Sequence, residues 1–220
     1  ISWSLMFICV AIFIYMLILP EEMQRQITYL YGMVPIRYSN PEWSTSFGLP
    51  PDMGMSFLTS LFLHSGWLHI IINMWFMWIF AKSIEGRMGH GGFFVFYLLC
   101  GLIATFAQWY FDPDLTIPVV GASGAIAGVL GAYFCIFPYA RIVLWLPVFL
   151  LPIFFEVPAI AFLGFWIIIQ FQNATSALLF EGVSVSVAWW AHLGGFIAGV
   201  FLHPLFVGAK KEINNDGIAD

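Results

Sequence analysis

The chain has 220 residues, of which 61% are hydrophobic and only 9% charged, and its mean hydropathy is +0.92. Soluble domains carry about 25% charged residues, so this composition excludes an ordinary soluble protein and indicates a chain built for lipid. The formal net charge of −5 excludes a nucleic-acid partner, because the chain has too few cations to neutralise a phosphate backbone. The three cysteines lie inside apolar runs, and their odd number supports neither a disulfide framework nor a CxxC metal site.

Six apolar runs are candidates for helices that cross a membrane, since about 20 apolar residues at 1.5 Å each span roughly 30 Å of hydrocarbon. We predict these helices over residues 1–19, 68–84, 92–111, 122–137, 158–171 and 188–207. The first is expected to be a spanning helix and not a signal peptide, because no small-residue cleavage site follows it. The sequence therefore predicts an all-α membrane protein, in which residues 1–220 form a single transmembrane domain built as a six-helix bundle.

The segments between these runs are predicted to lie at the membrane surfaces. Residues 20–56 form a long outer loop, and residues 172–187 form a second outer loop. The apolar segment 141–158 contains Pro147 and Pro152, which suit an uninterrupted helix poorly, so we expect it at a membrane interface.

Basic residues predict the orientation, because cytoplasmic loops carry an excess of Lys and Arg. The opposite face has only Arg25 and Arg37, whereas the loops after the second, fourth and sixth helices carry Lys82, Arg87, Arg141, Lys210 and Lys211. We therefore expect both chain ends in the cytoplasm, in a bacterial inner membrane or an equivalent one.

Polar side chains begin three of the predicted helices on the outer side. His64, His69 and Asn73 lie at the start of the second helix, Ser123 at the start of the fourth and His192 at the start of the sixth. A lone serine in a membrane helix is usually a packing residue, and a lone histidine is usually a satisfied structural donor. Polar side chains at the outer starts of three helices are better explained by a functional site, since each unpaired polar group costs free energy in lipid.

Glycines make close approach of the fourth and sixth helices possible. Gly124 and Gly128 are four residues apart, as are Gly195 and Gly199, and this spacing allows helix backbones to touch. Together with Gly121 these glycines are predicted structural residues beside the site, and they would bring Ser123 within hydrogen-bond reach of His192.

Serine and histidine in contact suggest nucleophilic catalysis, because a serine hydroxyl needs an adjacent base and imidazole has a suitable pKa. Such chemistry also needs donors for the oxyanion, which His69, the Asn73 amide and the backbone N–H of Ser123 could supply. Neither Asp nor Glu is near these positions in the sequence, so we predict a Ser–His dyad without a carboxylate.

The same residues carry a resemblance to a known family. Residues 121–128 (GASGAIAG) resemble the GxSGxxxG signature of rhomboid intramembrane serine proteases, and residues 191–199 (AHLGGFIAG) look like their AHxxGxxxG. Residues 62–74 are similar to the family's second-helix motif, and residues 85–89 (EGRMG) to its ExRxG. The four motifs stand in the family's order and cover roughly residues 57–207.

The resemblance implies that Ser123 is the nucleophile, His192 the general base, and His69 with Asn73 the oxyanion stabilisers. It also implies a structural pair of Glu85 and Arg87 at the cytoplasmic end, and a structural or hydrating role for His64. Many members carry an aromatic residue four positions after the nucleophile, where this chain has Ala127, so another group must orient His192.

By the same resemblance, a six-helix core surrounds a water-filled cavity that residues 172–187 cap. The expected partners are the lipid bilayer and transmembrane protein substrates, which are cleaved near the outer face without a cofactor or a metal.

One alternative is a rhomboid-like module that binds membrane proteins without cutting them. A transporter with a histidine relay is a weaker alternative, since the spans lack acidic relay groups. A metal site is weakest, because no HExxH motif occurs.

Overall fold

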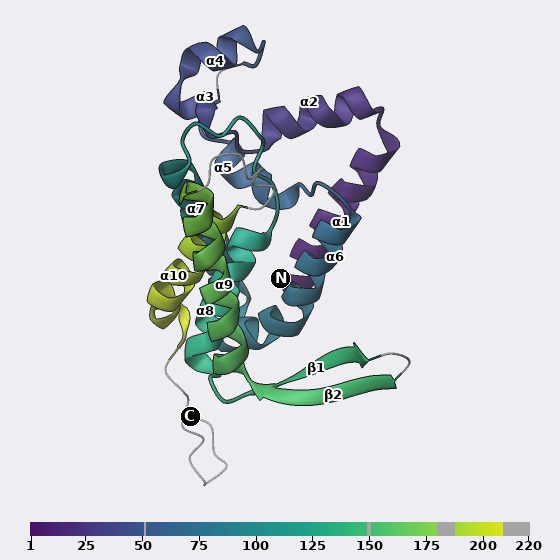
Figure 1. The fold of residues 1–220 in the computed structure, drawn as a ribbon, viewed down its shortest axis with the longest axis vertical. Helices are drawn as coiled ribbons and strands as arrows, with labels where there is room; N and C mark the ends of the chain where they lie inside the picture. The colour runs from purple at the N-terminus through teal and green to yellow at the C-terminus, as the bar shows by residue number, and fades with distance from the viewer. Residues whose placement is uncertain (51, 149–150, 180–187, 209–220) are drawn as a thin grey trace.

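The computed structural model describes residues 1–50, 52–148, 151–179 and 188–208, and within them the chain is mostly helical (Figure 1). The long helical elements are α1 (Ser2–Ile18), α6 (Trp67–Phe76), η2 (Met77–Ala81), α7 (Lys82–Phe111), α8 (Ser123–Ile136), α9 (Ala159–Leu179) and α10 (Trp189–Phe206). Short helices occupy the predicted outer loop and the residues after it: α2 (Glu21–Tyr31), α3 (Ile36–Ser39), α4 (Pro41–Ser46), α5 (Ser56–Thr59) and η1 (Ser60–Phe62).

The second and third predicted helices are continuous with each other except at one glycine. The elements α6, η2 and α7 follow without a loop from Trp67 to Phe111, and only Gly89, with φ of +73°, leaves the helical conformation. A straight helix of these 45 residues would be about twice as long as the hydrocarbon is thick, so the turn at Gly89 divides the stretch into two arms. The predicted loop over residues 85–91 is thus helical apart from a single residue that tolerates positive φ.

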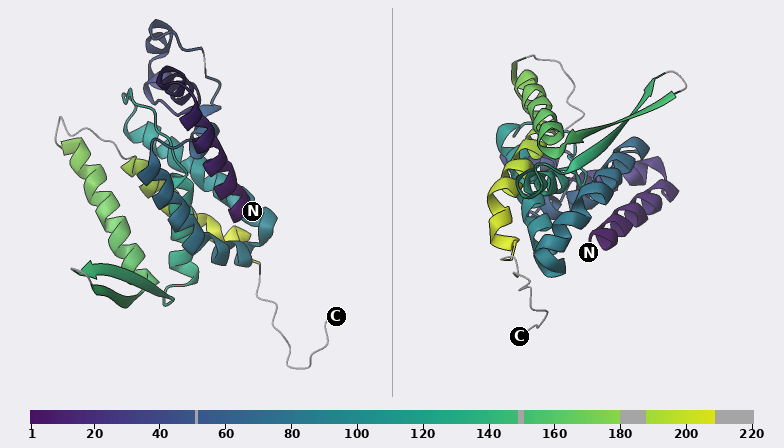
Figure 2. Two further views of the ribbon diagram at one scale, coloured as in Figure 1. Left: turned by 90° about the vertical axis from the view of Figure 1, so that its right-hand side faces the viewer. Right: turned by 90° about the horizontal axis from the view of Figure 1, so that it is seen from below.

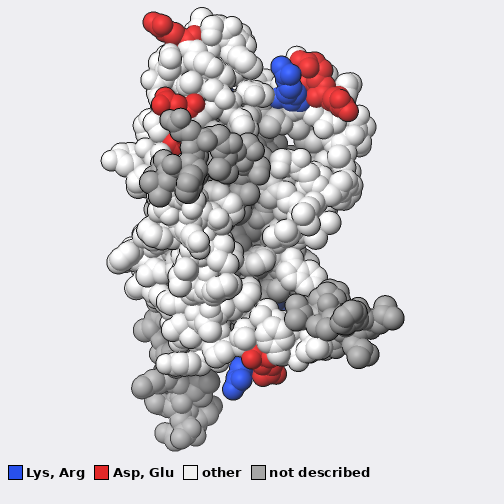
Figure 3. All heavy atoms as spheres, viewed as in Figure 1, with Lys and Arg blue, Asp and Glu red and all other residues white. Residues whose placement is uncertain are grey.

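The described residues have the surface of a membrane protein. The stretches Trp67–Phe111 and Ala159–Ser176 are long and apolar enough to cross a membrane, and α1 and α8 are apolar but shorter. On the face shown in Figure 3, the described charged side chains gather toward the two ends of the molecule and leave the middle free of them. An uncharged band between two polar ends is the pattern that a bilayer requires.

The core is the contact of α8 with α10 and α7. A Cβ added to Gly199 would lie 1.9 Å from the Gly128 carbonyl oxygen, and one added to Gly195 would lie 2.0 Å from that of Gly124. The α8 and α10 backbones therefore touch directly, which confirms the close approach predicted from the glycine spacing. Gly128 also packs against Cys100 of α7.

A β-hairpin replaces the irregular segment predicted after the fourth helix, so the all-α prediction is wrong there. Strands β1 (Arg141–Val148) and β2 (Leu151–Pro158) pair antiparallel, with Arg141 opposite Pro158. Figure 2 shows the hairpin projecting from the end of the bundle where α8 ends and α9 begins. Its prolines disfavour a helix, whereas its many β-branched and aromatic residues favour strands.

The predicted second outer loop is also partly helical. Helix α9 continues to Leu179, so residues 172–179 belong to the helix, and residues 180–187 lie outside the described residues. The prediction ended this helix where the apolar run ends, but the following residues include no proline or glycine that would stop a helix.

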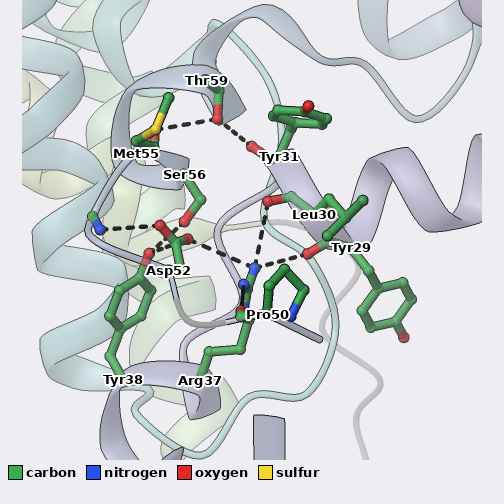
Figure 4. A network of polar contacts seen from close by, with 11 residues as sticks. Tyr29, Leu30, Tyr31, Arg37, Tyr38, Pro50, Asp52, Met55, Ser56 and Thr59 are labelled. Atoms are coloured by element: carbon green, nitrogen blue, oxygen red, sulfur yellow. Dashed lines mark hydrogen bonds and ion pairs between the residues drawn. The ribbon is translucent and has the colours of Figure 1, made fainter. Parts of the chain in front are cut away.

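A buried arginine organises the outer segment (Figure 4). The Arg37 guanidinium donates to the backbone carbonyls of Tyr29 at 3.0 Å and Pro50 at 2.9 Å, and it lies 3.6 Å from the Asp52 carboxylate. Its side chain is only 2% exposed. One cation thereby ties the end of α2 to the extended chain before α5.

Asp52 is the other centre of this network. Its carboxylate accepts hydrogen bonds from the Tyr38 hydroxyl and the Gly54 N–H, and Tyr38 also contacts the Ser56 hydroxyl. Burial by itself would raise the pKa of Asp52, but the hydrogen bonds from Ser56 and Tyr38 and the charge of Arg37 outweigh it and lower that pKa. Burial, together with the bond to Asp52, raises the pKa of Tyr38.

The outer segment is joined to the loop that leads into α8. Met33 and Val119 exchange backbone hydrogen bonds of 3.0 and 2.7 Å, and the Ile36 N–H donates to the Leu115 carbonyl. Met33 is fully buried. The network around Arg37 therefore supports the residues immediately before Ser123.

The direct contact of α8 and α10 predicts a strong effect of a single methyl group. Gly199→Ala should destabilise the fold by about 1–3 kcal/mol, because overpacking forces two backbones apart. Gly91→Ala is the matched control: Gly91 lies in α7 with no neighbour near its Cβ position, so alanine there should be neutral or slightly stabilising. Thermal unfolding in detergent measures both, and equal stability of the two variants would contradict the contact.

The Asp52 network predicts sensitivity of the outer segment to acid. Because the pKa of Asp52 is lowered by folding, the ionised carboxylate stabilises the fold above the unfolded pKa near 3.9, and this stabilisation is lost as the pH falls through the folded pKa. Asp52→Asn should therefore lower Tm at pH 7 and flatten its decline below about pH 4. Glu42→Gln, at an exposed carboxylate of α4, should leave the wild-type profile unchanged, and a similar profile for Asp52→Asn would refute the role of this network.

Candidate active site

Ser123 is the first residue of α8, and a constrained glycine turn places it there. Gly121 has φ of +127°, a conformation that glycine adopts readily, and its N–H donates to the Ser60 carbonyl at 2.9 Å. A Cβ on Gly121 would lie 2.7 Å from Nε2 of His69. Both the backbone conformation and the available space therefore require glycine two residues before Ser123.

The structure brings Ser123 and His192 together. The Ser123 Oγ lies 2.9 Å from Nε2 of His192, which α10 carries in its first turn, and both side chains are half-buried. Buried Gln108 of α7 accepts a hydrogen bond from the Ala191 N–H at 3.3 Å, next to His192. This bond satisfies one of the free N–H groups at the start of α10 and fixes the helix beside α7.

Residues of α9 hold the other side of the His192 ring. The Gln170 Oε1 lies 2.8 Å from Nδ1, and the Trp166 ring lies 5.8 Å from the imidazole. The ring of Trp189, which belongs to α10 itself, lies 6.2 Å from the imidazole. Gln170 is not among the site residues predicted from the sequence, although it lies within the predicted fifth helix. The sequence could have indicated Gln170, since a side-chain amide within an apolar membrane span needs a hydrogen-bond partner.

His69 and Asn73 are four residues apart on one face of α6, and both side chains approach Gly121. Their Nε2 and Nδ2 atoms are 2.7 and 3.6 Å from the Cβ position of Gly121. Asn73 is buried, and its Nδ2 has no hydrogen-bond partner among the described residues. Ser65 Oγ lies 3.0 Å from Nδ1 of His69, on the far side of that ring. Two side-chain nitrogens that can donate hydrogen bonds thus lie close to the start of α8, and the Asn73 nitrogen makes no hydrogen bond within the described residues.

His64 stands behind His69 and not beside the serine. The two imidazole rings are 5.2 Å apart, and both His64 ring nitrogens are buried without a hydrogen-bond partner in the described part of the chain. Its ring packs against that of His69, which fits a residue that supports the site from outside.

The predicted pair of Glu85 and Arg87 does not form. The Glu85 carboxylate accepts hydrogen bonds from the backbone nitrogens of Ile1 at 2.7 Å and Ser2 at 3.0 Å, whereas the Arg87 guanidinium lies 5.7 Å from the centre of the Phe137 ring. Residues two apart on a helix point in different directions, so the two charges cannot face each other. Glu85 instead binds the start of α1, and Arg87 lies against the end of α8.

Comparison with known proteins places most of the chain in one family. Residues 51–209, which include α6 to α10 and all the site residues above, match the model of the Rhomboid domain. The match covers more than half of the chain.

Individual relatives cover smaller parts. The chain is 33% identical to Rhomboid protein 1, mitochondrial, of Saccharomyces cerevisiae over 152 residues, which is 66% of this chain and 40% of the relative. It is 31% identical to Presenilin-associated rhomboid-like protein A, mitochondrial, of Danio rerio over 162 residues, 70% of this chain and 37% of the relative. It is 39% identical to Rhomboid protease GluP of Bacillus subtilis over 75 residues, 34% of this chain and 14% of the relative. The chain thus spans two fifths or less of the length of these relatives, which come from mitochondria and from a bacterium.

Proposed function

The chain belongs to the rhomboid family of membrane proteins, and on that basis we propose that it is an intramembrane serine endopeptidase that cleaves transmembrane segments of other membrane proteins near the outer face. The observation that carries the proposal is the 2.9 Å contact between Ser123 Oγ and His192 Nε2. The family includes a relative named as a protease, which agrees with this reading.

The proposed topology has six crossings. They are α1, the arm from Trp67 to Gly89, the arm from Gly89 to Phe111, α8, α9 and α10. The basic residues near the Gly89 turn and the hairpin mark the cytoplasmic side, which places α2 to α5 and the start of α8 on the outer side. In this proposal α1 begins and α10 ends on the cytoplasmic side of a bacterial inner membrane or an equivalent one, while Lys210 and Lys211 lie outside the described residues.

The serine and histidine can carry out both halves of a peptide hydrolysis. His192 Nε2 accepts the proton of Ser123 as Oγ attacks the substrate carbonyl carbon, and it returns the proton to the leaving amine. Water then attacks the acyl group and loses a proton to the same nitrogen, which returns that proton to Ser123 Oγ as the acyl group leaves. One imidazole nitrogen in hydrogen-bond contact with the hydroxyl is sufficient for all four proton transfers.

The developing oxyanion has three candidate donors. The Ser123 N–H begins α8 and has no partner within the helix, while His69 Nε2 and Asn73 Nδ2 stand near Gly121. Because Ser65 can donate to Nδ1 of His69, the ring can keep its proton on Nε2, where it points toward the site. The unused donor of buried Asn73 is the group that gains most from an incoming oxyanion.

The substrate must unwind before it can react. In lipid, every helical carbonyl is hydrogen-bonded within its own helix, so an intact helix offers no free carbonyl to Ser123. We therefore propose a preference for segments with small or helix-weakening residues around the scissile bond.

Covalent labelling tests the nucleophile and the base. The detergent-solubilised protein should react with a serine-directed fluorophosphonate, and Ser123→Ala and His192→Ala should each abolish the reaction, because one removes the nucleophile and the other its base. Ser46→Ala, at an exposed serine of α4, is the control and should label like wild type. A folded wild-type protein that does not label would favour the non-proteolytic alternative.

The oxyanion assignment makes a kinetic prediction. Asn73→Ala should lower kcat for a transmembrane substrate by about 10²–10³-fold, with little change in KM, since the lost hydrogen bond forms mainly in the transition state. Asn40→Ala, which removes a helix cap on the outer segment, should affect stability more than kcat. Unchanged kcat in Asn73→Ala would remove Asn73 from the oxyanion site.

A further inference from the structure

Gln170 makes a second hydrogen bond to the imidazole that contacts Ser123. It belongs to α9, is 5% exposed, and places Oε1 2.8 Å from Nδ1 of His192. Its side-chain nitrogen lies 3.3 Å from the Trp166 carbonyl oxygen, one turn back on the same helix. The amide is therefore held between its own helix backbone and the histidine of α10.

These two contacts determine which way the amide faces. A backbone carbonyl can only accept, so the NH₂ group of Gln170 must be the one that faces Trp166. Reversing the amide would place its oxygen against the Trp166 carbonyl oxygen and leave that contact without a proton, so the reversed orientation is unfavourable in a buried place. Oε1 consequently faces His192, where it can only accept.

The orientation of the amide in turn determines the histidine tautomer. Since Oε1 accepts, Nδ1 of neutral His192 must carry the proton, and the lone pair is then on Nε2. That nitrogen lies 2.9 Å from Ser123 Oγ, so the hydroxyl donates to it. The other neutral tautomer would lose the bond to Gln170 and would place a proton where the base must accept one.

We propose that Gln170 is a positioning residue, which holds His192 in the tautomer and ring orientation that let it accept the Ser123 proton. This inference rests on the proposed function for its kinetic part alone. It also identifies the group that orients His192 in a chain that has Ala127 after the nucleophile. When His192 is protonated, the same oxygen continues to accept from Nδ1–H and stabilises the imidazolium.

A neutral amide suits this place better than a carboxylate. Among the described residues that contact His192, the partners are Ser123 of α8, Gln170 and Trp166 of α9, and Trp189 of α10 itself. None of them carries a positive charge, and His69, whose charge also acts on His192, is an imidazole and not a permanent cation, so an ionised carboxylate in this membrane-embedded place would lack a fixed counter-charge. Glutamine supplies the acceptor without that cost.

The decisive measurement is the tautomer of His192 in the full chain. With ¹⁵N-labelled histidine in detergent, the imidazole nitrogen shifts should show Nδ1 protonated, with the His192 signal among the five histidines assigned by its loss in His192→Ala. Gln170→Met conserves volume and removes the acceptor, and it should populate both tautomers. Gln172→Met, at an exposed glutamine of α9, is the control and should leave the spectrum unchanged. A wild-type-like His192 spectrum in Gln170→Met would overturn the proposal.

Kinetics supply the second test. Gln170→Met should lower kcat about tenfold with KM unchanged, as expected for one buried hydrogen bond. Gln170→Glu should recover most of that loss, because burial keeps its carboxyl protonated, and a neutral carboxyl supplies one oxygen that accepts from His192 and one hydroxyl that donates to the Trp166 carbonyl. Equal losses in Gln170→Met and Gln170→Glu would indicate a merely structural role and would contradict the proposal. If wild type shows the Nδ1–H tautomer but cleaves nothing, the proposed function fails while the positioning of His192 by Gln170 stands.

Discussion

The backbone contact between α8 and α10 is the constraint on which the rest of the site depends. In lipid, apolar side chains gain little by leaving their surroundings, so helices associate through close packing. Gly128 and Gly199 provide this packing, because a Cβ on Gly199 would lie only 1.9 Å from a carbonyl oxygen of α8. If the two helices were further apart, Ser123 would separate from His192. Their 2.9 Å hydrogen bond would be lost after a small increase in that distance.

Each of the other elements around the pair contributes one kind of support. Helix α6 brings His69 and Asn73 to the start of α8, and α7 fixes the start of α10 through Gln108. Helix α9 contacts the far side of His192 through Gln170. The outer segment acts through backbone hydrogen bonds to the loop before Ser123, and its own fold depends on the buried cation of Arg37. The site is therefore assembled from many distant segments around one contact.

The sequence predicted the features that depend on local spacing. Small residues four apart predicted the contact of α8 with α10, and apolar runs predicted α1, α8 and α10 to within two residues of their bounds. It did not predict features set by tertiary contacts: the strand pairing of residues 141–158, the partner of Glu85 and the role of Arg37. Gln170 was not predicted because the third residue of a catalytic triad is usually a carboxylate, whereas a site in lipid can use an uncharged acceptor.

The glycine contact also has a consequence for protein engineering. At Gly124–Gly195 and Gly128–Gly199 a carbonyl group of α8 meets a glycine of α10, so these two contacts contain no side chain that could be exchanged or repacked. Exposed side chains on the outer faces, such as Ile197 and Phe201 of α10, point away from that interface. Libraries that randomise those faces can alter which neighbouring helices the protein accepts while they leave the reactive centre undisturbed.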